Sequence, residues 1–377
     1  MAKRINALLV WLLLAMLFVP LVLQYMGSPF SHKPLAGEKA NTPQPGFHLN
    51  NFFNNTYQDS LSAYAENKNG LRLPLVRLKS QLLYNLLNDA PKGVIAGEQP
   101  YLYTEDYLRA WSGLARTPDS ILNYRFTQLQ LLNNWLQQQN KKLMIVFAPG
   151  KASFHQKGIP AFFKQRKKTI TDYTVTRDRL LASGIPFIDF NAYFQKIQDT
   201  SQYQLFPKQG VHWSVYGAAI GFDSIAKKVE QLIQKPMLHI QWTGGELTTK
   251  AQSSDDDLLQ LLNLNYYKPV DTLYYPWFNF TDTTNAYKPR ILFIGDSYVF
   301  TMLATYLHLT ILSDQSKFWW QSGSQWDMST RYLPDIPVSS LNIRKEVLNY
   351  DVVVFVWTEI NYTTLEQDIY QRIIHSK

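Results

Sequence analysis

The chain has 377 residues, of which 46% are hydrophobic, enough to bury the core of one large or two modest domains. It contains no cysteine, which excludes disulfides, thiolate catalysis and Cys-ligated zinc. The net charge of +8 comes from Lys and Arg residues that form no long basic run, which argues against nucleic-acid binding. The seven histidines form no closely spaced metal pair, so the sequence predicts neither a metal site nor a cofactor.

The N-terminus has the pattern of a membrane anchor. Lys3 and Arg4 precede an uncharged apolar run over residues 7–23, which is long enough to cross a bilayer. Positive charge before the run keeps the N-terminus cytoplasmic and directs the remaining chain across the membrane. Residues 23–27 offer no small-x-small cleavage site, which favours an uncleaved anchor over a signal peptide. We therefore expect residues 1–27 to form a single transmembrane helix in the inner membrane, with the globular part on the periplasmic side.

Residues 28–50 are rich in Pro, Gly, Ser and Lys, which is typical of a linker. The remaining chain, residues 51–377, is predicted to form one domain. It begins with a helix over 71–88, where leucines recur at three and four residues, and a hairpin over 94–103.

Strand and helix signals alternate through the rest of the chain. Apolar strands are predicted at 143–148, 186–190, 291–294, 317–320 and 351–357, and helices at 124–139, 173–182, 214–233 and 300–312. An insertion rich in Tyr, Trp and Asn occupies 236–289. Near-continuous apolar strands separated by helices indicate an α/β fold with a mainly parallel sheet flanked by helices.

A candidate nucleophile follows the strand at 291–294. That strand runs directly into Gly295-Asp296-Ser297, and ligands of such sheets bind at the carboxyl ends of the strands. Gly295 permits a tight turn, and a serine at the start of the next helix has backbone N–H groups nearby that favour an oxyanion. The alternative is a helix cap, because Asp and Ser are both common at that position.

A candidate general base lies in the loop Gly210-Val211-His212-Trp213, just ahead of a predicted helix. A histidine there can reach across the strand ends and accept the proton of Ser297. The alternative is a loop histidine that packs on Trp213. Because both signals occur in one chain of suitable architecture, we interpret Ser297 as nucleophile and His212 as general base.

At these residues the sequence resembles the SGNH, or GDSL, hydrolase superfamily, and more closely its alginate O-acetyltransferase branch, the AlgJ- and AlgX-like proteins. Other members carry the serine block before the histidine block, whereas this chain has the circularly permuted order of that branch. Residues 143–149 with Lys151, the segment Asp257-Leu258-Leu259-Gln260-Leu261-Leu262, and the hairpin 94–103 also resemble blocks of the branch. The resemblance extends from about residue 50 to the C-terminus and implies an SGNH-hydrolase-like fold.

One position departs from the branch, which has Asp-x-His-Trp where this chain has Gly210. Gln209 does not replace the acid, because an amide cannot stabilise an imidazolium as a carboxylate does. Either another acid replaces it or the site works as a slower Ser-His dyad. Asp189 and Glu359, which end two predicted strands, are the candidate substitutes, and we prefer a substitute acid, Glu359. Asp296 is counted with the catalytic residues, although it is placed to bond the backbone of its own turn.

The resemblance also implies residues around the reacting carbonyl. Gly323 and Asn361 are the nearest matches to the oxyanion-binding Gly and Asn of the superfamily. Trp213 and Lys151 belong to matching blocks and are assigned to substrate binding.

A Ser-His site performs acyl transfer through a serine ester. The resemblance implies O-acetylation of an exported polysaccharide, with a membrane-bound O-acyltransferase as the acetyl donor. One alternative is a carbohydrate acetylesterase, in which water takes the acetyl group. Another is a non-catalytic polysaccharide-binding or assembly component of the same fold, which the missing acid at Gly210 favours.

Overall fold

The computed structural model describes residues 2–26, 34–37, 42–90, 93–281, 285–329, 336–361 and 369–375. The chain divides into two compact units, one of residues 1–92 and 259–268, the other of residues 93–258 and 269–377. The second unit carries the predicted strands.

The first unit is helical. Its helices before residue 93 are α1 (Ala2–Met26), α2 (Leu49–Phe53), α3 (Thr56–Lys68) and α4 (Arg72–Leu87). The last of these matches the helix predicted over 71–88. Among the helices that the structure describes, none combines the length and apolarity that crossing a membrane requires, so the predicted transmembrane helix is not supported. Residues 27–33 and 38–41 of the predicted anchor and linker lie outside the described residues.

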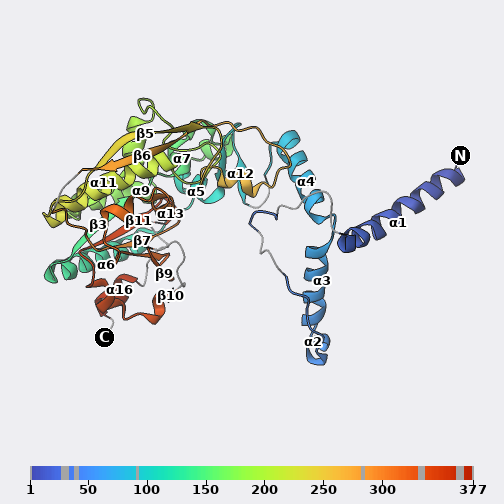
Figure 1. Cartoon of the computed structure of the whole chain (residues 1–377), viewed down its shortest axis with the longest axis horizontal. Helices are drawn as coiled ribbons and strands as arrows, with labels where there is room; N and C mark the ends of the chain where they lie inside the picture. Colours follow the sequence, from blue (N-terminus) through green and yellow to red (C-terminus); the bar gives the residue numbers. More distant parts are fainter. Residues whose placement is uncertain are drawn as a thin grey trace. The chain divides into compact units, whose positions relative to one another are not determined.

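The described residues of the second unit form a seven-stranded sheet with the order β10-β9-β8-β7-β11-β3-β4 (Figure 1). Its strands are β3 (Lys142–Phe147), β4 (Phe187–Asp189), β7 (Ile291–Gly295), β8 (Lys317–Trp320), β9 (Ser324–Asp327), β10 (Ile336–Pro337) and β11 (Val352–Trp357). From β8 to β4 neighbouring strands pair in parallel, whereas β9 and β10 add antiparallel pairs at one edge. The prediction of a mainly parallel sheet is confirmed.

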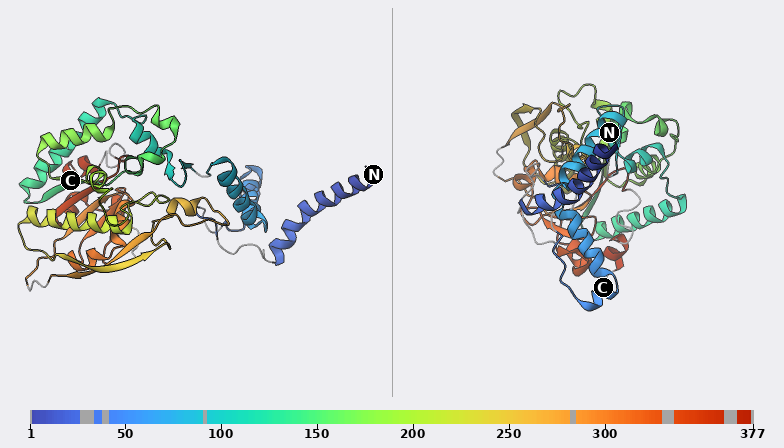
Figure 2. Two further views of the ribbon diagram at one scale, coloured as in Figure 1. Left: turned by 90° about the horizontal axis from the view of Figure 1, so that it is seen from above. Right: turned by 90° about the vertical axis from the view of Figure 1, so that its right-hand side faces the viewer.

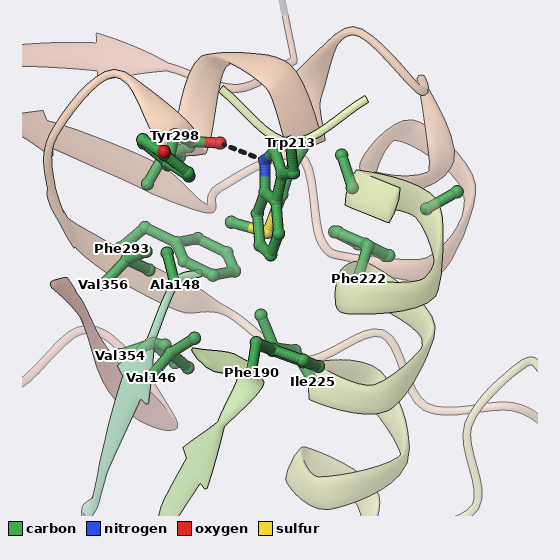
Figure 3. Packing of buried hydrophobic residues seen from close by; sticks show 14 of the residues in the cluster. Val146, Ala148, Phe190, Trp213, Phe222, Ile225, Phe293, Tyr298, Val354 and Val356 are labelled. Atoms are coloured by element: carbon green, nitrogen blue, oxygen red, sulfur yellow. Dashed lines mark hydrogen bonds between the residues drawn. The ribbon is translucent and has the colours of Figure 1, made fainter. Parts of the chain in front are cut away.

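Helices cover both faces of this sheet (Figures 1 and 2). They are α5 (Glu105–Ser112), α6 (Asp119–Gln138), α9 (Asp172–Ser183), α10 (Phe190–Ile197), α11 (Val215–Ile233), α13 (Tyr298–Leu303), α14 (Leu307–Ile311), α15 (Ile343–Val347) and α16 (Ile369–His375). The central strand β11 shows why two layers are needed, because successive side chains of a strand point to opposite faces. Val354 and Val356 pack in the cluster that contains residues of α10 and α11 (Figure 3), whereas Val353 and Phe355 pack with residues of α6 and α16.

Shorter elements join these layers. The predicted hairpin is present as β1 (Val94–Ala96) and β2 (Leu102–Thr104). The predicted insertion contains the antiparallel pair β5 (Ile240–Thr248) and β6 (Leu273–Phe280), with α12 (Asp257–Leu261) between them in the chain. The remaining short helices are α7 (Lys151–Phe154), α8 (Ala161–Lys164), η1 (Gln156–Gly158) and η2 (Val338–Ser340).

One predicted helix is divided. The helix expected over 300–312 is present as α13 and α14, which are separated at Tyr306. Tyr306 has a φ of 60°, and a right-handed helix cannot continue through a residue with positive φ.

Candidate active site

Ser297 lies at the carboxyl end of β7, immediately before α13. Gly295 and Asp296 shape this turn. A Cβ atom at Gly295 would lie 2.5 Å from the carbonyl oxygen of Val356, so only glycine allows β7 and β11 to approach this closely here. Asp296 accepts hydrogen bonds from the amide of Tyr298 at 2.9 Å and from Thr358 Oγ1 at 2.9 Å. The turn is therefore fixed on both sides of the serine.

His212 faces this serine. Its Nε2 lies 2.7 Å from Ser297 Oγ, and the histidine is only 9% exposed. At this distance an unprotonated Nε2 can accept the hydroxyl proton directly. The structure thus brings together the two residues that the sequence analysis paired as nucleophile and base.

Asp257, at the start of α12, contacts the histidine on the side opposite Ser297. Its Oδ2 lies 2.7 Å from His212 Nδ1, and its Oδ1 accepts the amide hydrogen of Val211 at 2.8 Å. A carboxylate on Nδ1–H leaves Nε2 unprotonated toward the serine and stabilises the imidazolium that forms when the proton arrives. In the sequence, Asp257 is recognisable only as part of the segment Asp257-Leu258-Leu259-Gln260-Leu261-Leu262, and no role was predicted for it.

Gly210 explains how this acid reaches the histidine. A Cβ atom at position 210 would lie 2.7 Å from the carbonyl oxygen of Asp255 and 2.8 Å from Pro207 Cγ. Because backbone cannot yield as a flexible side-chain end does, any side chain here would push the segment 255–257 away. Glycine at position 210 therefore leaves the space that lets the segment 255–257 place Asp257 against His212.

We expect Gly210→Asp to lower kcat rather than to restore activity. The new Cβ displaces the backbone that carries Asp257, and a shift of about 1 Å in a catalytic group can reduce the rate about 10²-fold. The measurement is kcat for a chromogenic acetyl ester together with the melting temperature. Gly46→Ala is the control, because a Cβ there meets only a side-chain atom, His48 Nε2, at 3.6 Å. A gain in kcat for Gly210→Asp would show that the segment tolerates the side chain.

The two acids that the sequence analysis considered as substitutes lie elsewhere, and this corrects the prediction for Glu359. Glu359 accepts hydrogen bonds from Ser153 Oγ and Asn191 Nδ2 and is 6% exposed. Burial raises the pKa of Glu359, while those two hydrogen bonds oppose the rise. Asp189 caps α10 by accepting the amide hydrogen of Ala192 at 2.9 Å. Neither acid is the partner of His212 Nδ1.

Asp296 bonds its own turn, as its position indicated. Besides Tyr298 and Thr358, its carboxylate accepts a hydrogen bond from Asn361 Nδ2. Burial raises the pKa of Asp296, and these three hydrogen bonds act in the opposite direction. Asp296 therefore positions the nucleophile turn, and Asp257 rather than Asp296 bonds the histidine.

The two predicted oxyanion donors make other hydrogen bonds. The amide of Gly323 donates to the carbonyl of Trp320 at 3.0 Å and so closes the turn between β8 and β9. The side-chain amide of Asn361 donates to Asp296 Oδ2 and to Thr358 Oγ1 at 3.1 Å. Both groups thus stabilise turns next to the site, and their role as oxyanion donors stays a prediction.

Lys151 and Trp213 are buried to 0% exposure, which corrects their assignment to substrate binding. Lys151 Nζ donates to the carbonyl of Pro207 and lies 5.2 Å from the centre of the Phe206 ring. Trp213 Nε1 donates to the carbonyl of Tyr298 at 3.3 Å, the dashed line of Figure 3. Lys151 thus holds the loop before His212, and Trp213 joins that loop to the helix after Ser297.

Two buried charged groups beside this loop predict how stability varies with pH. Burial raises the pKa of Asp255 from its usual 3.8 to about 7 and lowers the pKa of Lys151 from 10.5 to about 7. From pH 3.8 to about 7 the folded protein holds the proton of Asp255 more tightly than the unfolded chain, so stability falls as pH rises. From about 7 to 10.5 the unfolded chain binds more protons at Lys151, so stability rises with pH.

We therefore expect Asp255→Asn to reduce the loss of stability between pH 4 and 7, and Lys151→Met to reduce the gain above pH 7. Melting temperatures of the wild type and both variants across this range provide the measurement. If each variant shows the same slope as the wild type, these two groups do not titrate in these windows.

A serine at the end of a central strand, hydrogen-bonded to a histidine that in turn contacts an aspartate, is an arrangement suited to acyl transfer. The family model described as "SGNH hydrolase-like domain, acetyltransferase AlgX" matches residues 94–342, and the chain belongs to this family. No curated protein matches the sequence.

Several solved structures have folds similar to that of this chain. The O-acetyltransferase domain of Pseudomonas putida AlgJ is 15% identical, with a TM-score of 0.47, and the match covers 76% of this chain and 99% of that one. For Pseudomonas aeruginosa AlgX the identity is 15%, the TM-score 0.47, and the coverage 74% of this chain and 65% of that one. For Bacillus cereus PatB1 the identity is 11%, the TM-score 0.42, and the coverage 74% and 98%.

Proposed function

We propose that this protein is a serine-dependent O-acetyltransferase that moves acetyl groups onto an exported polysaccharide. The observation that carries the proposal is the hydrogen-bonded chain from Ser297 Oγ through His212 to Asp257, with 2.7 Å at each step. Membership of an acetyltransferase family supports acetyl as the transferred group.

In the first half-reaction, His212 Nε2 takes the proton of Ser297 while Oγ attacks the carbonyl carbon of the acetyl donor. The tetrahedral intermediate collapses as the bond to the leaving oxygen breaks, and His212 gives the proton that it took from Ser297 to that oxygen. Ser297 now carries the acetyl ester. Asp257 stabilises the positive imidazolium during both proton transfers.

In the second half-reaction, His212 takes a proton from a hydroxyl group of the glycan, whose oxygen attacks the acetyl-serine. Collapse returns the proton to Ser297 Oγ and releases the O-acetylated glycan. The same steps with water in place of the glycan give an acetylesterase, so the acceptor decides between the two activities.

The amide of Ser297 is the donor best placed for the oxyanion in this proposal. The amides of Tyr298 and Val299 both bond Asp296, through its Oδ1 and its carbonyl respectively. The Ser297 N–H adjoins the attacking oxygen on the same residue, and preorganised donors of this kind stabilise developing negative charge.

The acetyl group has to reach an extracytoplasmic acceptor, so we propose a membrane-bound O-acyltransferase as the donor and a periplasmic domain held at the inner membrane. Lys3 and Arg4 before the apolar run 7–23 of the sequence support this placement. We expect protease added outside spheroplasts to digest residues 93–377 while a cytoplasmic marker stays intact. Protection of the domain together with that marker would contradict the placement.

The test of function is incubation with a chromogenic acetyl ester, with and without glycan acceptors. Release of the chromophore, an acetylated peptide containing Ser297, and acetyl groups on the glycan by mass spectrometry are the expected results. Chromophore release with acetate as the sole product would indicate the esterase. A folded protein that neither releases chromophore nor forms acetyl-serine would favour the non-catalytic component.

A further inference from the structure

A cavity of about 370 Å³ lies beside the helix α5. Its wall is formed by α5, the segment that follows α5, the start of α9 and the segment that follows β11. The charged and amide side chains in this wall are Asp106, Arg109, Arg116, Asp172, Glu359 and Asn361. None of them belongs to the hydrogen-bonded chain from Ser297 to Asp257.

The cavity begins close to the nucleophile. β11 and β7 are neighbouring strands, in which Val356 pairs with Gly295, so Glu359 and Ser297 follow adjacent strand ends. Neighbouring strands lie about 4.8 Å apart. Asn361 lines the cavity and also donates to Asp296, the residue before the nucleophile. A molecule in this cavity therefore lies one strand away from the Ser297 turn.

Glu359 provides the observation that points to a ligand. It is 6% exposed, and its Oε1 takes the hydrogen bonds from Ser153 and Asn191, while Oε2 has no partner among the described residues. A buried polar atom without a partner costs about 1–3 kcal/mol, and native structures leave few of them. A Cβ atom at Gly150 would lie 2.4 Å from the Glu359 carboxyl carbon, so a glycine keeps space for this carboxyl group.

The charges around the cavity are largely balanced. Arg116 pairs with Asp172 at 2.9 Å, and Arg109 pairs with Glu105 at 3.6 Å. With Asp106 and Glu359 also in the wall, no excess positive charge is present to attract an anion. Side-chain carboxyl and guanidinium groups around a small volume instead match a ligand that both donates and accepts hydrogen bonds through neutral hydroxyl groups.

We propose that this cavity binds one neutral sugar unit of the acceptor glycan and that the Glu359 carboxyl group, after a rotation that opens the enclosed Oε2 to the cavity, hydrogen-bonds a hydroxyl of that sugar. The link to acetyl transfer rests on the proposed function, whereas the binding itself does not. We expect such a site to prefer uncharged sugars to uronic acids, because Arg116 and Arg109 are already paired with acids and a sugar carboxylate would also approach Asp106 and Glu359.

The binding experiment uses the full chain with Ser297→Ala, so that no turnover occurs. Neutral gluco-, manno- and galacto-configured hexasaccharides and an oligouronate are titrated by calorimetry. At least one neutral hexasaccharide should bind, and Glu359→Gln and Arg109→Ala should each weaken its binding about tenfold or more, which is 1.4 kcal/mol. Lys227→Ala, an exposed residue of α11, is the matched control and should bind as tightly as the parent.

Three results would overturn the proposal: no binding of any neutral hexasaccharide, tighter binding of the oligouronate, or unchanged affinity in both variants. Arg109→Ala changes a side chain that is 46% exposed, so it remains informative even if Glu359→Gln is unstable. Chromogenic-ester hydrolysis by the wild type reports on the Ser297 site separately. The experiments thus test the acetyl-transfer chemistry and the sugar binding separately, so either proposal can be contradicted without the other.

Discussion

Ser297→Ala should abolish hydrolysis of a chromogenic acetyl ester and the transfer of acetyl groups to glycan. Without Oγ no acetyl-serine forms, and His212 has no hydroxyl proton to accept. Loss of the nucleophile of a serine triad lowers kcat by about 10⁶-fold, so the remaining rate should fall to the level of the uncatalysed background. The measurement is kcat by stopped-flow or, at low rates, by end-point absorbance.

The fold should survive this change, because Ser297 is partly exposed and its hydroxyl bonds only His212 among the described residues. A melting temperature close to that of the wild type is expected. Ser224→Ala is the matched control, since that hydroxyl bonds the Ile220 carbonyl within α11 and should leave kcat unchanged. Wild-type turnover by folded Ser297→Ala would eliminate the acetyl-serine mechanism.

The sequence was sufficient to predict the nucleophile and the base because each sits in a short local motif. Ser297 ends an apolar strand through Gly295, and His212 lies in a glycine-bearing loop before a helix. The sheet was also predictable, since its inner strands are buried on both faces and therefore read as continuous apolar runs.

The acid of the site was not predictable in the same way. Asp257 lies 45 residues from His212 in the chain and directly follows Asp255 and Asp256, so nothing local distinguishes it from its neighbours. The signal that could have identified it was Gly210, where the missing side chain makes room for the segment carrying Asp257. A glycine at this position indicates that another segment of the chain packs closely against the loop, and that segment can carry the acid.

Glu359 and Lys151 show a second reason why part of the site could not be predicted from the sequence. Both follow apolar strands at the expected edge of the sheet, where a sequence pattern predicts side chains near the ligand. Whether such a side chain turns toward the serine or into the protein depends on contacts with distant residues, here Ser153 and Asn191 for Glu359 and Pro207 for Lys151. Local patterns carry no information about those contacts.

Asp257→Asn should lower kcat for the chromogenic ester by about 10⁴-fold, the loss seen when the acid of a serine triad is replaced by its amide. Asparagine keeps the size of the side chain and can still accept the Val211 amide hydrogen. It cannot stabilise the imidazolium, and its NH₂ group can bond Nδ1 and favour the tautomer with a proton on Nε2, which then cannot accept the Ser297 proton.

The neighbouring change Asp256→Asn is the control, because it removes the same charge one residue away while leaving the 2.7 Å contact between Asp257 and His212 in place. It should keep kcat within about twofold of the wild type, since a partly exposed charge that does not contact the histidine is screened by solvent. If Asp257→Asn retains more than about a tenth of the wild-type kcat, His212 works without this carboxylate. In that case the site is a Ser-His dyad, and Gly210 reflects packing rather than the relocation of an acid.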